Sequence, residues 1–156
     1  MNKLQEFIKK FTEKEIFPEN ELVKQGREFY LQKKNIQETT DKIGEELIHA
    51  GIYLGETKSN IFTTSLHLLE LISPHTNKKV VLDENTAWLF ACGRDVFVKN
   101  IENNFDIEQG EFVIVVNKRS EVLGLAKKSK DKNNIIYKNI IDIGDYLRRE
   151  QKKKKH

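Results

Sequence analysis

The sequence predicts an α+β protein of two domains, in which a small antiparallel sheet with helices precedes a small closed β barrel. Three observations predict this architecture. The 156 residues alternate between helix-periodic and strand-forming segments, which are separated by glycine and polar turns. The unbroken apolar run Phe112–Val116 is typical of a strand covered on both faces. Gly110 and Gly124 stand on either side of this run, where a barrel must turn or admit another backbone.

The first half of the chain contains helical and strand patterns in alternation. Leu4, Phe7, Ile8 and Phe11 recur at helical spacing, and Pro18 ends that pattern. The elements predicted here are a helix over Lys3–Phe17, a hairpin around residues 24–27, a helix over Lys33–Ile43, strands over Leu47–Leu54 and Ile61–Ser65, and a short helix over residues 66–72.

The polar segment Pro74–Lys79 is the predicted domain boundary, which gives domains over residues 1–77 and 78–156. In the second domain Asp83 is placed to cap a helix, and Gly93 is placed to end it in the left-handed conformation. The strands predicted here are Val80–Leu82, Val96–Val98, Phe112–Val116, Val122–Ala126, Ile135–Tyr137 and Ile140–Ile141.

Charge is distributed unequally between the two halves. Residues 1–77 carry 10 basic and 12 acidic side chains, and residues 78–156 carry 17 and 12, so the halves have net charges of −2 and +5 and the whole chain +3. The basic excess of the second half favours a polyanionic partner. No apolar run is long enough to span a membrane, and the charged N-terminus is unlike a signal peptide, so no membrane association and a cytoplasmic location are expected.

The residues that carry enzyme chemistry are not arranged in a recognisable pattern. The sequence has no phosphate-cradling glycine loop, zinc-protease helix or nucleophile elbow, and its paired carboxylates have no partner that would hold one protonated. The single cysteine, Cys92, is expected to be a small buried packing residue, and Trp88 a core residue more often than a base-stacking one. No catalytic residue, metal or cofactor is expected.

Clustered cations are the strongest functional signal. Six of the eight residues 148–155 are basic, and on a helix Arg148, Lys152 and Lys155 would share one face that could follow phosphates, with Arg149 beside them. A second cluster begins at Lys127 and Lys128. The alternative for Lys153–Lys155 is a solubilising tail.

Several sequence pieces resemble known families. GRDVF, GEFVIVVN, VLGLAKKS and DIGDYLRRE resemble, in order and spacing, the PUA domain, a small RNA-binding pseudobarrel. YLQKK, GEELIHAGIYLG and LLELISPHTNKKVVL resemble the preceding domain of the nuclear-import-protein-seven family, the archaeal and eukaryotic factors of large-subunit biogenesis. The resemblance implies an N-terminal antiparallel sheet with helices that contacts other assembly proteins, followed by a PUA-type β pseudobarrel that binds RNA.

The resemblance also implies where RNA is bound. The PUA surface that meets RNA corresponds here to residues 83–90, 93–99 and 141–149. The residues expected to contact RNA are therefore Arg94, Lys99, Arg148, Arg149 and Lys152, followed by Lys127, Lys128 and Lys155. One departure is that Lys99-Asn100-Ile101 stands where many PUA domains have a glycine.

The expected function is that of a non-catalytic RNA-binding factor in large ribosomal subunit biogenesis and rRNA processing. Its partners would be pre-rRNA, structured or AU-rich, and other ribosome-assembly proteins bound through residues 1–77. A monomer is expected, cytoplasmic, or nucleolar and nuclear in a eukaryote. The alternatives are an RNA-modification enzyme or its accessory subunit, because PUA domains often accompany such enzymes, and a protein-interaction adaptor.

Overall fold

The structure is a computed structural model that describes residues 1–33, 51–101, 106–145 and 148. The chain divides into two compact units, Met1–His75 and Thr76–His156. Within the described residues, every helix is too short or too polar to cross a membrane. The helix predicted over Lys33–Ile43 and the first residues of the strand predicted over Leu47–Leu54 lie outside the described residues.

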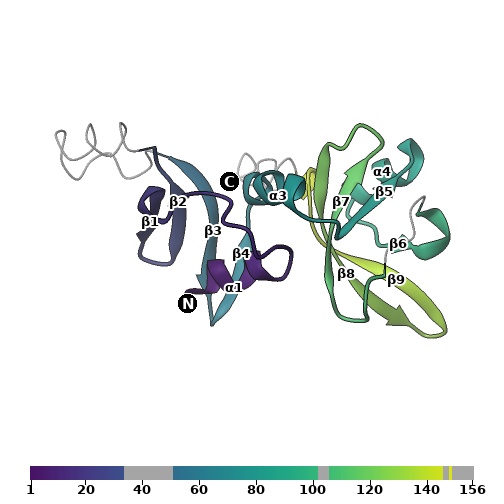
Figure 1. The fold of residues 1–156 in the computed structure, drawn as a ribbon. Helices are drawn as coiled ribbons and strands as arrows, with labels where there is room; N and C mark the ends of the chain where they lie inside the picture. The colour runs from purple at the N-terminus through teal and green to yellow at the C-terminus, as the bar shows by residue number, and fades with distance from the viewer. Residues whose placement is uncertain (34–50, 102–105, 146–147, 149–156) are drawn as a thin grey trace, which may run out of the picture. The chain divides into compact units, whose positions relative to one another are not determined.

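The first unit is built on a four-stranded antiparallel sheet (Figure 1). The strands are β1 (Leu22–Gln25), β2 (Glu28–Leu31), β3 (Ile52–Lys58) and β4 (Ile61–Thr64), and they are neighbours in chain order. The predicted hairpin between β1 and β2 is confirmed, with Gly26 in the left-handed conformation at its turn. The next two strands pair in the antiparallel sense, as predicted, but β3 runs on to Lys58 instead of ending at Leu54, and its last residues, from Gly55, are the ones that face β4.

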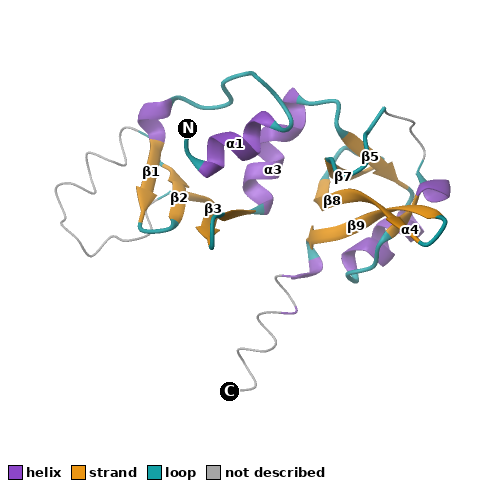
Figure 2. Cartoon of the chain, turned by 90° about the horizontal axis from the view of Figure 1, so that it is seen from below, coloured by secondary structure: helices purple, strands orange, loops and turns teal. Residues whose placement is uncertain are grey.

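Helices α1 (Lys3–Lys9) and α3 (Leu66–Ile72) lie beside this sheet (Figure 2). Phe7 on α1 packs against Phe62 on β4 with their ring centroids 5.3 Å apart, and Phe29 on β2 packs against the same ring at 5.9 Å. Ser65 caps α3 by accepting a hydrogen bond from the backbone N–H of Leu68. Short 3₁₀ turns occupy Glu19–Glu21 and Ser73–His75.

The first helix is shorter than predicted, because it ends at Lys9 rather than Phe17. Its last turn tightens, and the N–H groups of Lys10 and Phe11 bond three residues back, to Phe7 and Ile8. The Thr12 hydroxyl then accepts a hydrogen bond from the N–H of Lys14, a local turn that competes with the helix. Phe11 is buried nevertheless, so the apolar pattern marked the core correctly but not the helix end.

The second unit is a curled five-stranded sheet that forms a β half-barrel, with one helix beside it (Figure 1). Its elements are β5 (Lys79–Leu82), α4 (Glu84–Ala91), β6 (Val96–Phe97), a 3₁₀ turn (Val98–Asn100), β7 (Phe112–Asn117), β8 (Val122–Asp131) and β9 (Asn134–Asp142). The strand order is β5-β7-β8-β9-β6, with β5 and β7 parallel and the other pairs antiparallel. A bridge between Leu82 and Ile101 links the β5 edge to the segment that follows β6, and this link curls the sheet on itself.

The inside of this curled sheet is the core of the second unit. Phe90 of α4, fully buried, packs there with side chains from every strand. These are Val80, Leu82, Val96, Val113, Val115, Leu123, Ala126 and Tyr137, with Ile107 from the loop before β7. At Gly124 a Cβ atom would lie 2.0 Å from the carbonyl oxygen of Ile141, which confirms the close backbone approach predicted there.

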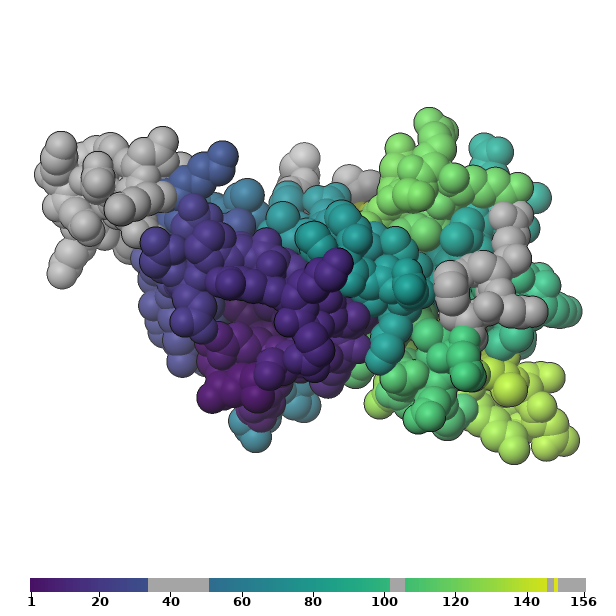
Figure 3. All heavy atoms as spheres, in the orientation of Figure 1, coloured from purple at the N-terminus to yellow at the C-terminus, as the bar shows by residue number. Residues whose placement is uncertain are grey.

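Three strands of the second unit differ from prediction. β8 continues five residues past the predicted end at Ala126, because β9 pairs with it as far as Asp131 opposite Asn134. The two predicted closing strands are one strand, β9, with a register shift where Leu125 and Ala126 face it. β6 ends at Phe97, where the 3₁₀ turn begins. In the space-filling view the yellow-green tip of the β8–β9 hairpin reaches the surface at the lower right (Figure 3).

Candidate nucleic-acid interface

The corner that follows α4 is a rigid backbone feature. Asp83 caps the start of the helix by accepting a hydrogen bond from the N–H of Thr86 at 2.8 Å. At its end the N–H of Gly93 donates to Phe90 O at 2.9 Å and the N–H of Arg94 donates to Leu89 O at 3.1 Å. These two bonds, with Gly93 at φ +90°, form a Schellman motif. The cap and the glycine end predicted from the sequence are both confirmed.

Asn139 on β9 fastens this corner to the sheet. Its side-chain amide donates to Phe90 O at 2.9 Å and to Arg94 O at 3.4 Å. Its backbone N–H donates to the Asp95 carboxylate at 2.8 Å. The side chains of Asn139 and Asp95 therefore connect the corner to β9. Sequence reasoning missed this pairing because 44 residues separate the two.

The end of β9 is fastened to the same helix by an ion pair. Arg148 donates from Nη2 to both carboxylate oxygens of Asp142 at 2.9 Å and from Nη1 to Ala91 O at 2.9 Å. Asp142 is only 3% exposed and also accepts a hydrogen bond from the N–H of Gly144. Arg148, predicted to contact RNA, is thus already engaged within the second unit.

Apolar side chains are exposed on α4 and at the corner. Trp88 is 70% exposed and Cys92 is exposed, so their predicted burial is wrong. The reason is the phase of the helix, which buries Thr86 and Phe90 and leaves Trp88 on the other side. Phe97 follows at 46% exposed on β6.

Two predicted cations lie beside these apolar residues in the chain. Arg94 and Lys99 are both exposed, and Lys99 Nζ lies 5.8 Å from the centroid of the Phe97 ring. From residue 92 to residue 99 only Val96 is buried, because it points into the core. An exposed segment that carries a guanidinium, an ammonium and an aromatic ring can bind phosphates and stack on bases.

The second predicted cation cluster lies within β8 rather than after it. Lys127 Nζ lies 5.5 Å from the Phe112 ring centroid, and Lys127 is paired across the strands with Lys138. Two lysines in directly opposed positions repel each other, and an anion would relieve that repulsion. Lys128 donates to the carbonyl oxygen of Ile107 and is only partly exposed. The remaining predicted cations, Arg149, Lys152 and Lys155, lie outside the described residues.

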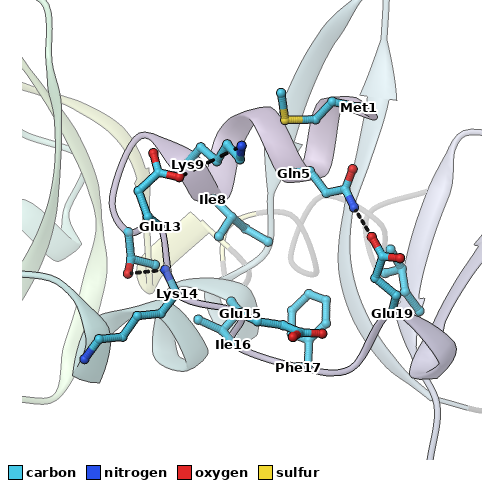
Figure 4. A pocket seen from close by; sticks show the side chains of 12 residues that line it. Met1, Gln5, Ile8, Lys9, Glu13, Lys14, Glu15, Ile16, Phe17 and Glu19 are labelled. Atoms are coloured by element: carbon cyan, nitrogen blue, oxygen red, sulfur yellow. Dashed lines mark hydrogen bonds and ion pairs between the residues drawn. The ribbon is translucent and has the colours of Figure 1, made fainter.

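The first unit has a cavity of about 570 Å³ between α1, the following loop and the start of β1 (Figure 4). Its polar lining is mixed in charge: Lys9 pairs with Glu13 at 3.9 Å, and Gln5 donates to Glu19 at 2.9 Å. Ile8 is its one buried lining residue. Since the charged groups of the lining are exposed and of mixed sign, the cavity lacks the convergent polar groups of a small-molecule site. Within the part of the chain that the structure describes, His, Cys, Asp and Glu also form no group that could hold a metal ion.

Comparison with known proteins relates the chain to one domain family. Residues 78–151 match the family described as the UPF0113 PUA domain. A UPF0113 protein of Archaeoglobus fulgidus is 29% identical over 118 residues, which cover 70% of this chain and 67% of that protein.

One solved structure gives the same relation at the level of the fold. A conserved PUA domain protein from Thermoplasma acidophilum superimposes with a TM-score of 0.51 at 14% identity, over 83% of this chain and 79% of that one. A hypothetical protein from Pyrococcus horikoshii gives a TM-score of 0.45 at 15% identity, over 80% and 77%. The second unit is therefore similar to PUA domains in sequence and in fold, as predicted, whereas membership of the nuclear-import-protein-seven family stays a prediction.

Proposed function

We propose that the chain is a non-catalytic RNA-binding factor of large ribosomal subunit biogenesis that acts in the cytoplasm or, in a eukaryote, in the nucleolus. A PUA domain suggests RNA binding, and the assignment to ribosome assembly rests on the sequence resemblance of both halves. One observation carries the proposal: the segment after α4 exposes Arg94, Phe97 and Lys99 on a backbone fixed by the Schellman motif and by Asn139. Cations on a fixed frame bind phosphates without first losing backbone entropy.

Trp88 extends the same surface along α4. Its ring is exposed on the helix that ends at the corner, and the N–H of Arg94 is bonded to the neighbouring Leu89 carbonyl. An exposed indole gives an unpaired base a stacking platform. The proposed RNA partner therefore includes at least one unpaired nucleotide, which agrees with AU-rich or locally open pre-rRNA.

The first unit is proposed to contact other assembly proteins. Its cavity is bordered by apolar side chains that are at least partly exposed, among them Met1, Ile16, Phe17 and Leu22. A partly apolar, mixed-charge hollow of this kind suits a protein side chain better than a polyanion.

The salt dependence of RNA binding tests the proposal. Affinity for a short single-stranded RNA is measured by filter binding at several salt concentrations for the full chain and for Arg94→Gln with Lys99→Gln. Each phosphate contact to a single strand contributes about −0.7 to the slope of log K against log salt, so the double variant should have a slope shallower by about 1.4.

The matched control is Arg27→Gln with Lys58→Gln, which removes one exposed arginine from the β1–β2 turn and one exposed lysine from the end of β3. It should leave the slope nearly unchanged. Equal slopes for all three proteins would refute this site, and no measurable RNA binding by the full chain would refute the function. Mass spectrometry of the incubated RNA checks the non-catalytic part, which an altered nucleoside would contradict.

A further inference from the structure

The carbonyl groups at the end of α4 need hydrogen-bond donors, because the last turn of a helix leaves them without partners inside the helix. The Schellman motif supplies donors for Leu89 O and Phe90 O. Ala91 O accepts from Arg148 Nη1, which belongs to a residue 57 positions later in the chain. A cation is favoured at this end of a helix, where the partial charges are negative. Arg148 therefore acts as a cap on α4.

Asp142 also holds the same guanidinium in place, by a second set of contacts. The carboxylate is nearly fully buried, and it accepts from Arg148 Nη2 and from the N–H of Gly144. The Arg148 side chain is 43% exposed, but without it the buried Asp142 carboxylate would lack its cation, which is unfavourable. Arg148 cannot swing toward an RNA phosphate without leaving both Asp142 and the helix end unsatisfied.

Two glycines lie close to the contact between Arg148 and the end of α4. A Cβ atom on Gly144 would lie 2.0 Å from Ala91 O, so the turn after β9 can approach the helix end only as glycine. A Cβ atom on Gly93 would lie 3.5 Å from Arg148 Nη2, so the guanidinium lies over the corner itself. The end of β9, the end of α4 and the corner thus meet at one side chain.

We propose that Arg148 is a positioning residue, which locks the Gly93–Arg94 corner onto the end of β9, and that the phosphate contacts are made by other cations. The inference rests on the proposed RNA-binding function but assigns this arginine a role different from the one its place in a basic cluster predicts. Arg94 and Lys99 then contact the RNA, while Arg148 and Asn139 fix the corner from which these two cations project.

Replacing Asp142 distinguishes a phosphate-binding Arg148 from a positioning Arg148, because the two roles predict changes of opposite sign in RNA affinity. If Arg148 bound phosphate, Asp142→Asn would free it and remove a negative charge, so RNA affinity would rise and the salt slope would steepen. As a positioning residue, Arg148 loses its anchor, so affinity should fall about threefold or more with the slope unchanged, since counterion release reports phosphate contacts alone. Tighter binding by Asp142→Asn would overturn the proposal.

Arg148→Gln carries the test if Asp142→Asn does not fold. Loss of a phosphate contact would make the salt slope shallower by about 0.7, whereas loss of positioning leaves the slope as it is and lowers affinity. Amide hydrogen exchange of the full chain without RNA gives a second readout. The N–H groups of Gly93 and Arg94 should exchange at least several-fold faster in Arg148→Gln, and Arg148→Lys should restore part of their protection.

The control is Lys138→Gln, an exposed cation of β9 that lies outside this network. It should leave the exchange of Gly93 and Arg94 unchanged. A shallower slope in Arg148→Gln with unchanged exchange would overturn the positioning role. If the wild-type chain bound no RNA, the proposed function would fail, and the exchange experiment would still decide whether Arg148 positions the corner.

Discussion

Trp88 is the residue whose environment says most about function. A large aromatic side chain is normally buried, and an indole that is 70% exposed on a well-capped helix contributes little to folding. Its neighbour Leu89 is 45% exposed, so two consecutive apolar side chains of the helix are open to solvent. Exposed apolar side chains beside cations are suited to a ligand that is both aromatic and anionic, which describes an unpaired nucleotide.

Replacing Trp88 by alanine should separate binding from stability. Stacking on an aromatic side chain is worth about 1–3 kcal/mol per base, so RNA affinity should fall roughly 5- to 150-fold. Because the ring is exposed, the free energy of unfolding should change by only about 0.5 kcal/mol. Fluorescence anisotropy with a labelled single-stranded RNA and urea unfolding measure the two quantities.

Trp88→Phe is the matched control, because it keeps an aromatic face and should retain most of the affinity. The salt slope should be the same in both variants, since neither changes a charge. Unchanged RNA affinity in Trp88→Ala would remove the ring from the interface, and a large loss of stability would mean that it belongs to the core after all.

The sequence could not decide the environment of Trp88 or Cys92. The run Ala87–Phe90 is apolar on every side of the helix, so its periodicity does not say which face is buried. Thr86 and Phe90 are the buried residues because the helix packs on the strands with that face, which the helix sequence alone does not show. The same limit hid the role of Arg148, because its partners Asp142 and Ala91 are brought to it by β9 and α4.

At the scale of elements, α4 with its two ends is the part on which the site depends. Asp83 caps its start, and the hydrogen bonds it accepts from the backbone N–H and side chain of Thr86 lower the pKa of the carboxyl group. A carboxyl group whose pKa is lowered by folding stabilises the folded state above its unfolded pKa of about 3.9. That stabilisation is lost as the pH falls through the lower, folded pKa.

Asp83→Ala should therefore lower the thermal midpoint at pH 7. The difference from the wild type should shrink as the pH is lowered below about 3.9, because the wild-type carboxyl group becomes protonated there. Circular dichroism melts between pH 7 and pH 3 give this difference directly. Asp83→Asn, which keeps a capping oxygen without a titrating charge, should lie closer to the wild type at pH 7. A gap that does not depend on pH would contradict the role given to the charge.

Local signals predicted most of the elements, and long-range pairing set their ends. Gly93 and Asp83 marked the limits of α4 correctly, because caps depend on neighbours within four residues. The length of β8 depends instead on its pairing with β9, which a polar run such as residues 127–131 does not reveal. Lysines predicted to follow the strand are therefore part of it.

At the scale of the whole molecule, the two units carry different charges. The basic excess lies in the half that matches the PUA-domain family, and the first 77 residues are slightly acidic. A basic half attracts RNA over distances of about a Debye length, about 10 Å at 0.1 M salt, whereas an acidic half is repelled by it. The division of charge favours one unit for RNA and the other for protein partners.

Titration of the isotope-labelled full chain with a short single-stranded RNA, followed through its amide NMR signals, tests the proposed interface most directly. The shifts should be concentrated at residues 88–99 and at the end of β9, and they should weaken as salt is added. Shifts confined to residues 1–75, or signals that do not move at saturating RNA, would contradict RNA binding by the second unit.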